Sequence, residues 1–270
     1  MIHPIGIGLS SWFWDPFLES WSGSEIFVPD LIGCGESELW EPSKKGLFVP
    51  LDYVRQLETL WSEKIKRPMV VMSQGGLAPI AVRLAADERD SFQGSLAVSG
   101  IVLTSPPTWS QMLEQLDEET VKRNFGQLSS LPGSLGYRLL LMRPFIKFFS
   151  DLFLFGSNQA DARWMEEATK RATFDARWAI IAFNSGMVEL PSLLSELTEV
   201  IKQPTLVLSG LTDKRAANRA GYGDGMANCQ LQQLPGQNVL PWESPKETCK
   251  SVAAFMEQLR IAKTQRLNLG

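Results

Sequence analysis

The chain has 270 residues, of which 44% are hydrophobic and 21% are charged. This composition is typical of a globular protein with a sizeable core, and the length fits one large α/β domain with room for an inserted subdomain. The net charge of −4 offers no electrostatic basis for binding nucleic acid, which excludes that class of partner.

The N-terminal part contains two glycine-containing turns. Residues 3–14 read HPIGIGLSSWFW, and this pattern fits either a turn that caps a helix at Ser10 or Ser11, or a loop whose backbone N–H groups serve a catalytic site. Glu25–Val28 is predicted to be a short strand that enters the sequence PDLIGCGES, residues 29–37. The glycines there permit turns that other residues would strain.

A strand-turn-helix follows in the next part of the chain. Residues 51–65 alternate apolar and charged residues with a helical period, and the apolar run over residues 68–72 predicts a buried strand. The strand leads into Ser73-Gln74-Gly75-Gly76 and then into a helical pattern from Leu77 to about Ala86. Such a turn can lift one side chain onto a sharp corner, and Ser73 is the residue predicted to occupy it.

The middle of the chain is predicted to be helical. A buried strand over residues 100–105 ends at Pro106-Pro107, and four helical stretches follow, over residues 111–128, 135–155, 160–174 and 175–187. The most apolar of these, residues 135–155, carries charges at about every fourth position and a proline. These features predict an amphipathic helix pair and exclude a transmembrane segment.

The last third contains two further strands, each followed by a polar turn. Residues 204–209 predict a buried strand that continues as G-x-x-D, ending at Asp213. Residues 231–234 predict a short strand that enters the sequence PGQNVLPWESP, residues 235–245, and a final helix from Ser244 to about Ile261.

Taken in order, these motifs resemble those of the α/β-hydrolase superfamily, from His3 to about Ile261. The resemblance implies a mostly parallel central sheet flanked by helices, with an all-helical cap inserted after the strand that ends near Ser105. It implies core segments at residues 1–107 and 191–270 and a cap at residues 108–190. More narrowly, the chain is similar to a subgroup of uncharacterised α/β-hydrolase-like proteins of photosynthetic organisms.

The resemblance also assigns roles to individual residues. It places Ser73 at the nucleophile, although Val71 stands where the family's first elbow glycine belongs, and it places Asp213 at the triad acid. Val239 falls at the position of the catalytic histidine. The backbone N–H groups of Ile5 and Gln74 would form the oxyanion hole, which stabilises a tetrahedral intermediate.

Valine at the histidine position removes the base. A serine hydroxyl is a poor nucleophile without an adjacent base, and the triad acid acts only through the imidazole. The chain has a single histidine, His3, which the motif assigns to a strand end below the oxyanion loop. The sequence therefore predicts a degraded triad. Residues preceding His3 are too few for the family's strands, so N-terminal strands are expected to be missing.

Three hypotheses remain open for function. The leading one is a catalytically impaired protein that binds an apolar small molecule, or a protein partner, at a capped pocket lined by Trp109, Phe145 and Phe149. The alternatives are an esterase- or lipase-like hydrolase in which Ser73 has a non-standard base, and an assembly factor that uses the cap. No cofactor or metal site is expected. An odd number of cysteines without C-x-x-C spacing favours a reducing, cytoplasmic compartment.

Overall fold

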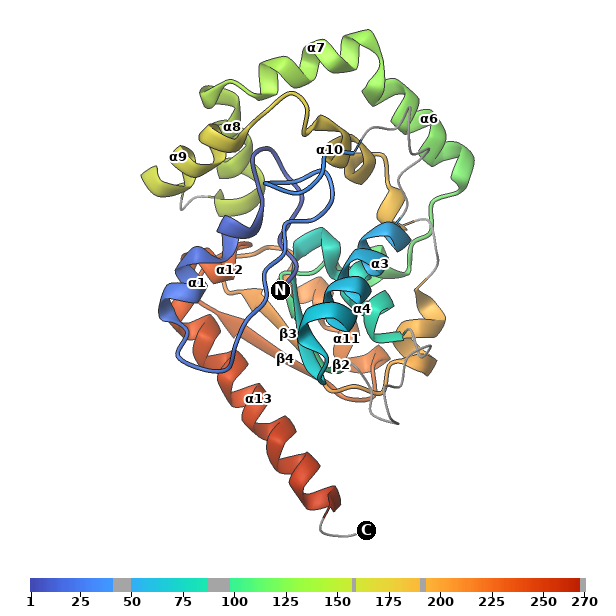
Figure 1. Cartoon of the computed structure of the whole chain (residues 1–270), viewed down its shortest axis with the longest axis vertical. Helices are drawn as coiled ribbons and strands as arrows, with labels where there is room; N and C mark the ends of the chain where they lie inside the picture. Colours follow the sequence, from blue (N-terminus) through green and yellow to red (C-terminus); the bar gives the residue numbers. More distant parts are fainter. Residues whose placement is uncertain (41–49, 87–97, 157–158, 190–192, 268–270) are drawn as a thin grey trace.

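The computed structural model of the chain describes residues 1–40, 50–86, 98–156, 159–189 and 193–267 (Figure 1). A sheet lies at the centre of these residues, with helices on both faces and a further group of helices at one end. The predicted α/β-hydrolase architecture is confirmed in these features.

The sheet has four parallel strands in the order β1-β2-β3-β4. They are β1 (Met69–Gln74), β2 (Val98–Thr104), β3 (Thr205–Gly210) and β4 (Cys229–Leu234). The register aligns Ser73 with Leu103 and Leu103 with Val207. Because the strands are parallel, their carboxyl ends all meet at one edge of the sheet.

The two faces of the sheet bury alternate residues of β1, β2 and β3. Val71, Leu103 and Val207 belong to one hydrophobic core, whereas Met72 and Val102 belong to a second. Both faces are covered there, which is why these three strands read as mainly apolar runs, whereas β4 (CQLQQL) is mostly exposed.

Each face is covered by its own helices. The first core receives side chains from α3 (Pro50–Leu60), α4 (Ala78–Ala86) and α11 (Gly221–Gly225), and the second from α1 (Asp15–Ser20), α12 (Leu240–Glu243) and α13 (Pro245–Leu267). Figure 1 shows α13 extending along the molecule to the C-terminus. Short 3₁₀ or π turns complete this part, at Ser11–Trp14, Trp61–Ile65, Gly75–Leu77 and Ala216–Arg219.

All elements described between β2 and β3 are helical. They are α5 (Trp109–Leu113), α6 (Glu118–Ser129), α7 (Leu131–Leu140), α8 (Arg143–Phe149), α9 (Ala162–Arg171) and α10 (Arg177–Asn184), with turns at Ser150–Phe155, Met187–Glu189 and Glu196–Val200. We call α5 to α10 the helical insertion. Its helices α6 to α10 form the upper layer in Figure 1.

Two predicted helices are broken in the structure. Residues 111–128 divide into α5 and α6 because Glu114 and Asp117 have extended backbones, and Asp117 caps α6 by accepting the Thr120 N–H at 2.7 Å. Residues 135–155 divide into α7, α8 and the turn Ser150–Phe155, with Pro144 in the first turn of α8. Proline fits a helix start but not its interior, so the break falls there.

The predicted strand at Glu25–Val28 is wrong, because these residues form no strand in the structure. Phe27 accepts a hydrogen bond from the Met1 ammonium group at 2.6 Å, but a strand requires a ladder of backbone bonds. Ile2, by contrast, forms a parallel bridge with Ser73, donating to the Met72 carbonyl at 2.8 Å.

Candidate functional site

The carboxyl ends of the four strands bring a set of polar residues to one edge of the sheet. Gln74 ends β1, Ser105 follows β2, Asp213 follows β3, and Asn238 lies in the loop after β4. Open parallel sheets place ligand sites at this edge, where loops rather than regular ladders carry the side chains. We therefore take this edge as the candidate site.

Ser73 lies within β1 rather than on the corner of the turn. It pairs with Leu103 on one side and with Ile2 on the other. Its side chain is 0% exposed, and its hydroxyl oxygen has no hydrogen-bond partner. Within the part of the chain that the structure describes, no base is therefore within hydrogen-bond reach of the hydroxyl.

The corner between β1 and α4 falls instead at Gly75, two residues after Ser73. Gly75 has a φ of +62°, a left-handed conformation that glycine adopts without strain. A Cβ atom built on Gly75 would meet no atom within 4 Å, so the corner faces open space. Ser73 was predicted to occupy the corner, but Gly75 occupies it and carries no side chain.

The predicted oxyanion donors are not a pair of free N–H groups. The Gln74 N–H donates to the Ile2 carbonyl at 3.3 Å, so strand pairing uses it. The Gln74 side chain is buried as well: its Oε1 accepts from Thr104 Oγ1 at 2.7 Å, and its Nε2 donates to the Asn238 carbonyl at 2.6 Å. Ile5 is half-buried and packs against the first core.

The loop after β4 points Val239 into the core. Val239 is 0% exposed and belongs to the second hydrophobic core. Its neighbour Asn238 is polar and buried: its Nδ2 donates to the Phe153 carbonyl at 2.9 Å, and its Oδ1 has no partner. The Glu243 carboxylate fixes this loop by accepting the backbone N–H groups of Gln237, Asn238 and Val239 at 2.9, 3.1 and 3.1 Å.

Asp213 is held by two arginines. Its Oδ2 accepts from Arg219 at 2.8 Å, and its Oδ1 accepts the Arg215 N–H at 3.0 Å. Burial alone would raise the pKa of Asp213, but these hydrogen bonds and the two positive charges outweigh it and hold the pKa below its usual value. Asp213 is therefore an ionised carboxylate engaged in ion pairs rather than with an imidazole.

His3 uses both of its ring nitrogens. Nε2 accepts the Leu31 N–H at 3.0 Å, which requires the proton to reside on Nδ1, and Nδ1 lies 2.9 Å from the Pro4 carbonyl oxygen to which it donates. The ring is fully buried, and this burial lowers the pKa of His3. His3 is thus a structural, neutral imidazole, in keeping with its predicted place below the loop.

The three predicted binding aromatics are not brought together by the contacts described. Trp109 packs edge-on against Tyr222 of α11, with ring centroids 5.1 Å apart. Phe149 stacks on Phe153 at 5.7 Å within the helical insertion, and Phe145 is 40% exposed on α8. Phe149 reaches the candidate site through Phe153, whose carbonyl binds Asn238, and Trp109 reaches it through Tyr222, whose hydroxyl donates to the Pro107 carbonyl at 2.9 Å.

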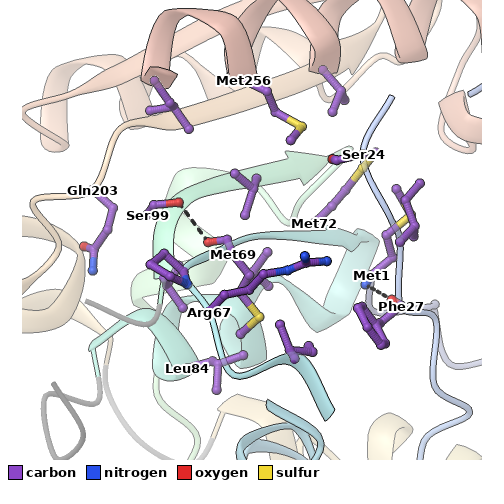
Figure 2. Close-up of a pocket in the computed structure, with 18 of the residues that line it drawn as sticks. Met1, Ser24, Phe27, Arg67, Met69, Met72, Leu84, Ser99, Gln203 and Met256 are labelled. Atoms are coloured by element: carbon purple, nitrogen blue, oxygen red, sulfur yellow. Dashed lines mark hydrogen bonds between the residues drawn. The ribbon is translucent and has the colours of Figure 1, made fainter. Parts of the chain in front are cut away.

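A large cavity lies elsewhere, along the free edge of β1. Figure 2 shows part of its lining, including Met1, Met69 and Met256. Its volume is 1090 Å³, and it is lined by residues of β1, α13 and residues 24–29. Neither Ser73, Asp213 nor Asn238 lines it, so it is distinct from the candidate site.

Two residues of the site, Gly75 and Ser105, were missed from the sequence. The Gly-Gly pair was a signal for the corner, but either Gly75 or Gly76 could have supplied it. Asn238 and Val239 are neighbours in the sequence, and only the path of the loop in the structure determines which of them faces the site. Ser105 has a φ of 44° and a buried hydroxyl without a partner, a strained conformation for a residue other than glycine that no pattern indicated.

Comparisons with known proteins agree with the fold. The model of the alpha/beta hydrolase family matches residues 1–251. The solved structure of MenH from S. aureus is 15% identical, with a TM-score of 0.69, over 94% of this chain and 92% of that chain. No curated protein matches the chain.

Two further solved structures are similar at the same level of identity. A thermophilic esterase from Thermogutta terrifontis is 15% identical, with a TM-score of 0.63, over 94% of this chain and 88% of that one. The enol-lactonase from Burkholderia xenovorans LB400 is 15% identical, with a TM-score of 0.61, over 93% of this chain and 88% of that one.

The described residues lack two other kinds of feature. They contain no group of three or more His, Cys, Asp or Glu side chains placed to hold a metal ion. None of the described helices combines the length and the apolar character that crossing a bilayer requires.

Proposed function

The chain belongs to the alpha/beta hydrolase family, and from this premise we propose that it is a member impaired in serine hydrolysis. Instead of catalysing hydrolysis, it binds an apolar small molecule at the carboxyl edge of the sheet, beneath the helical insertion, which acts as a cap. The observation that carries the proposal is the state of Ser73: its hydroxyl is fully buried and has no hydrogen-bond partner. A serine nucleophile needs a base within hydrogen-bond reach.

Two further observations support the loss of catalysis. The only histidine of the chain, His3, has both ring nitrogens engaged with backbone groups. The corner of the turn is occupied by Gly75, which offers no hydroxyl to the open space that it faces. Asp213 retains its charge but is paired with Arg219 and Arg215.

The chemistry of the ligand follows from the buried acceptors near this edge. Asn238 Oδ1 and Ser105 Oγ are both buried without partners, and a buried polar atom without a partner is costly. Asn238 also joins this edge to the helical insertion through Phe153. A molecule with an apolar body and one hydrogen-bond donor would satisfy such an acceptor and fill the space in front of Gly75.

The catalytic part of the proposal is tested with a fluorophosphonate probe and intact mass. We expect no labelling of the folded wild-type protein and none of Ser73→Ala. Labelling of the wild type that disappears in Ser73→Ala would overturn the proposal, since it would require an activated Ser73 and would favour the alternative of a working hydrolase.

The binding part is tested with 1-naphthol and naphthalene, which share an apolar ring system and differ by one hydroxyl donor. We expect 1-naphthol to raise the Tm of the wild-type protein more than naphthalene does. Asn238→Leu should remove this difference, because it removes the acceptor. Equal shifts with both compounds in the wild type would contradict a role for the buried acceptors.

A further inference from the structure

The helical insertion carries a series of large apolar side chains that are exposed to solvent. On α7, Leu131, Leu135 and Leu139 are 83%, 64% and 54% exposed. The series continues along the chain with Met142, Phe145, Phe148, Leu152 and Phe153, each at least 40% exposed. Single exposed apolar residues are ordinary, but a continuous run of them marks an interaction surface.

The three leucines form one stripe on the outer side of α7. They are spaced four residues apart, so they lie on the same face of the helix. The opposite side carries Tyr137, which is buried and packs against Phe174 with ring centroids 6.1 Å apart. Figure 1 shows α7 at the end of the molecule farthest from the C-terminus, where the described helices leave its outer side uncovered.

This segment also has a charge opposite to that of the whole chain. Residues 121–150 contain five basic residues and no acidic residue, whereas the chain has a net charge of −4. The basic residues are Lys122, Arg123, Arg138, Arg143 and Lys147. All of them except the half-buried Lys147 are exposed. Lys122 and Lys147 pair with Glu118 and Asp151, which lie just outside this range, so the positive charge rests mainly on the three arginines. An apolar stripe with positive charges around it is complementary to a surface that is negatively charged and can also accept apolar side chains.

We propose that α7 and the segment that follows it dock the protein on the surface of an anionic lipid bilayer. The leucine stripe enters the boundary between headgroups and acyl chains, while the basic residues contact the anionic headgroups. The helix lies in the plane of the membrane and does not cross it, in keeping with the composition of the described helices.

Charge argues against a second copy of the chain as the occupant. A two-fold symmetric contact through this stripe would place the same basic residues of two subunits opposite each other. A membrane surface has no such penalty. The inference is independent of the proposed ligand site, because none of the side chains in the stripe belongs to that site.

The test is co-sedimentation of the full chain with vesicles of phosphatidylcholine and phosphatidylglycerol, compared with vesicles of phosphatidylcholine alone. We expect binding to the anionic vesicles that weakens as salt is raised. Leu131→Ser/Leu135→Ser/Leu139→Ser should weaken binding by roughly tenfold or more. Arg123→Gln/Arg143→Gln should also weaken it by roughly tenfold or more.

The matched control replaces exposed leucines outside the insertion. Leu211 and Leu231 are 60% and 47% exposed, and Leu211→Ser/Leu231→Ser should leave vesicle binding unchanged. Circular dichroism and Tm verify that each variant is folded. The proposal is overturned if the wild type does not bind anionic vesicles at low salt, if the leucine variants bind as the wild type does, or if the chain self-associates through the stripe without binding vesicles.

Discussion

The side-chain amide of Gln74 donates to the backbone carbonyl of Asn238 across 2.6 Å. This bond joins the end of β1 to the loop after β4, between two residues that are 164 positions apart in the sequence. Thr104, at the end of β2, donates to the same amide at 2.7 Å. One buried side chain therefore ties the ends of β1 and β2 to the loop after β4 at the candidate site. Gln74 was expected to contribute a backbone N–H to catalysis, but its side chain has a structural role.

Replacing Gln74 by alanine should destabilise the protein. The change leaves the Asn238 carbonyl buried without this partner, which costs about 1–3 kcal/mol. The Thr104 hydroxyl keeps the Ser73 carbonyl as an acceptor at 3.0 Å. Urea unfolding of Gln74→Ala measures the loss. Gln230→Ala is the control, because Gln230 bonds to Gln258 in an exposed position. Equal effects of the two substitutions would contradict the role of Gln74.

Asp213 and Arg219 should contribute jointly to the free energy of unfolding, so that the effects of replacing each one are not additive. The two side chains are 3% and 2% exposed and lie 2.8 Å apart. Arg219→Met leaves a buried carboxylate with only Arg215, and we expect a loss of about 3 kcal/mol in the free energy of unfolding. Asp213→Leu should cost a similar amount.

The double variant Asp213→Leu/Arg219→Met is expected to be more stable than either single variant, because it leaves no unpaired charge. A double-mutant cycle from urea unfolding measures the coupling energy. Additive losses would mean that the two side chains act independently.

Replacement by alanine should destabilise the protein less at Gly75 than at Gly210. At Gly75 the new Cβ meets open space, so Gly75→Ala costs only the left-handed backbone conformation, about 1–2 kcal/mol. At Gly210 the new Cβ would lie 2.0 Å from the Gln237 carbonyl oxygen. Gly210→Ala must displace the loop that carries Asn238, at a cost of about 3 kcal/mol or more. Thermal unfolding ranks the two variants, and the reverse order would contradict the position of the corner.

His3 should make stability depend on pH. Its burial lowers the folded-state pKa below the ordinary value of 6.5, so the unfolded chain binds the proton more tightly. The resulting stability is fully present above pH 6.5 and is lost as pH falls toward the lowered pKa, with a slope of at most about 1.4 kcal/mol per pH unit. His3→Gln should lack this contribution.

The measurement is urea unfolding of both proteins between pH 5 and neutrality. Other groups remain in both proteins, including the Met1 ammonium, whose pKa burial lowers to about 5. The difference between the two curves therefore isolates His3. Because the chain has one histidine, its imidazole NMR signal gives the pKa directly, and a midpoint at or above 6.5 would contradict the buried neutral ring.

The sequence by itself determined the order of the elements and the family. Apolar runs identified β1, β2 and β3, because strands buried on both faces of a parallel sheet have few polar positions. The turn residues after each strand then placed Asp213 and the Asn238 loop at one edge. The helical character of the stretch between β2 and β3 was also visible from periodicity alone.

Only the tertiary structure decided which residue faces the site. Whether Ser73 or Gly75 forms the corner depends on where β1 stops pairing, and β1 continues through Gln74 because Ile2 and Leu103 hold Ser73 on both sides. Whether Asn238 or Val239 faces the site depends on Glu243, which binds three consecutive backbone N–H groups. Both choices rest on contacts between distant segments, and local pattern does not encode them.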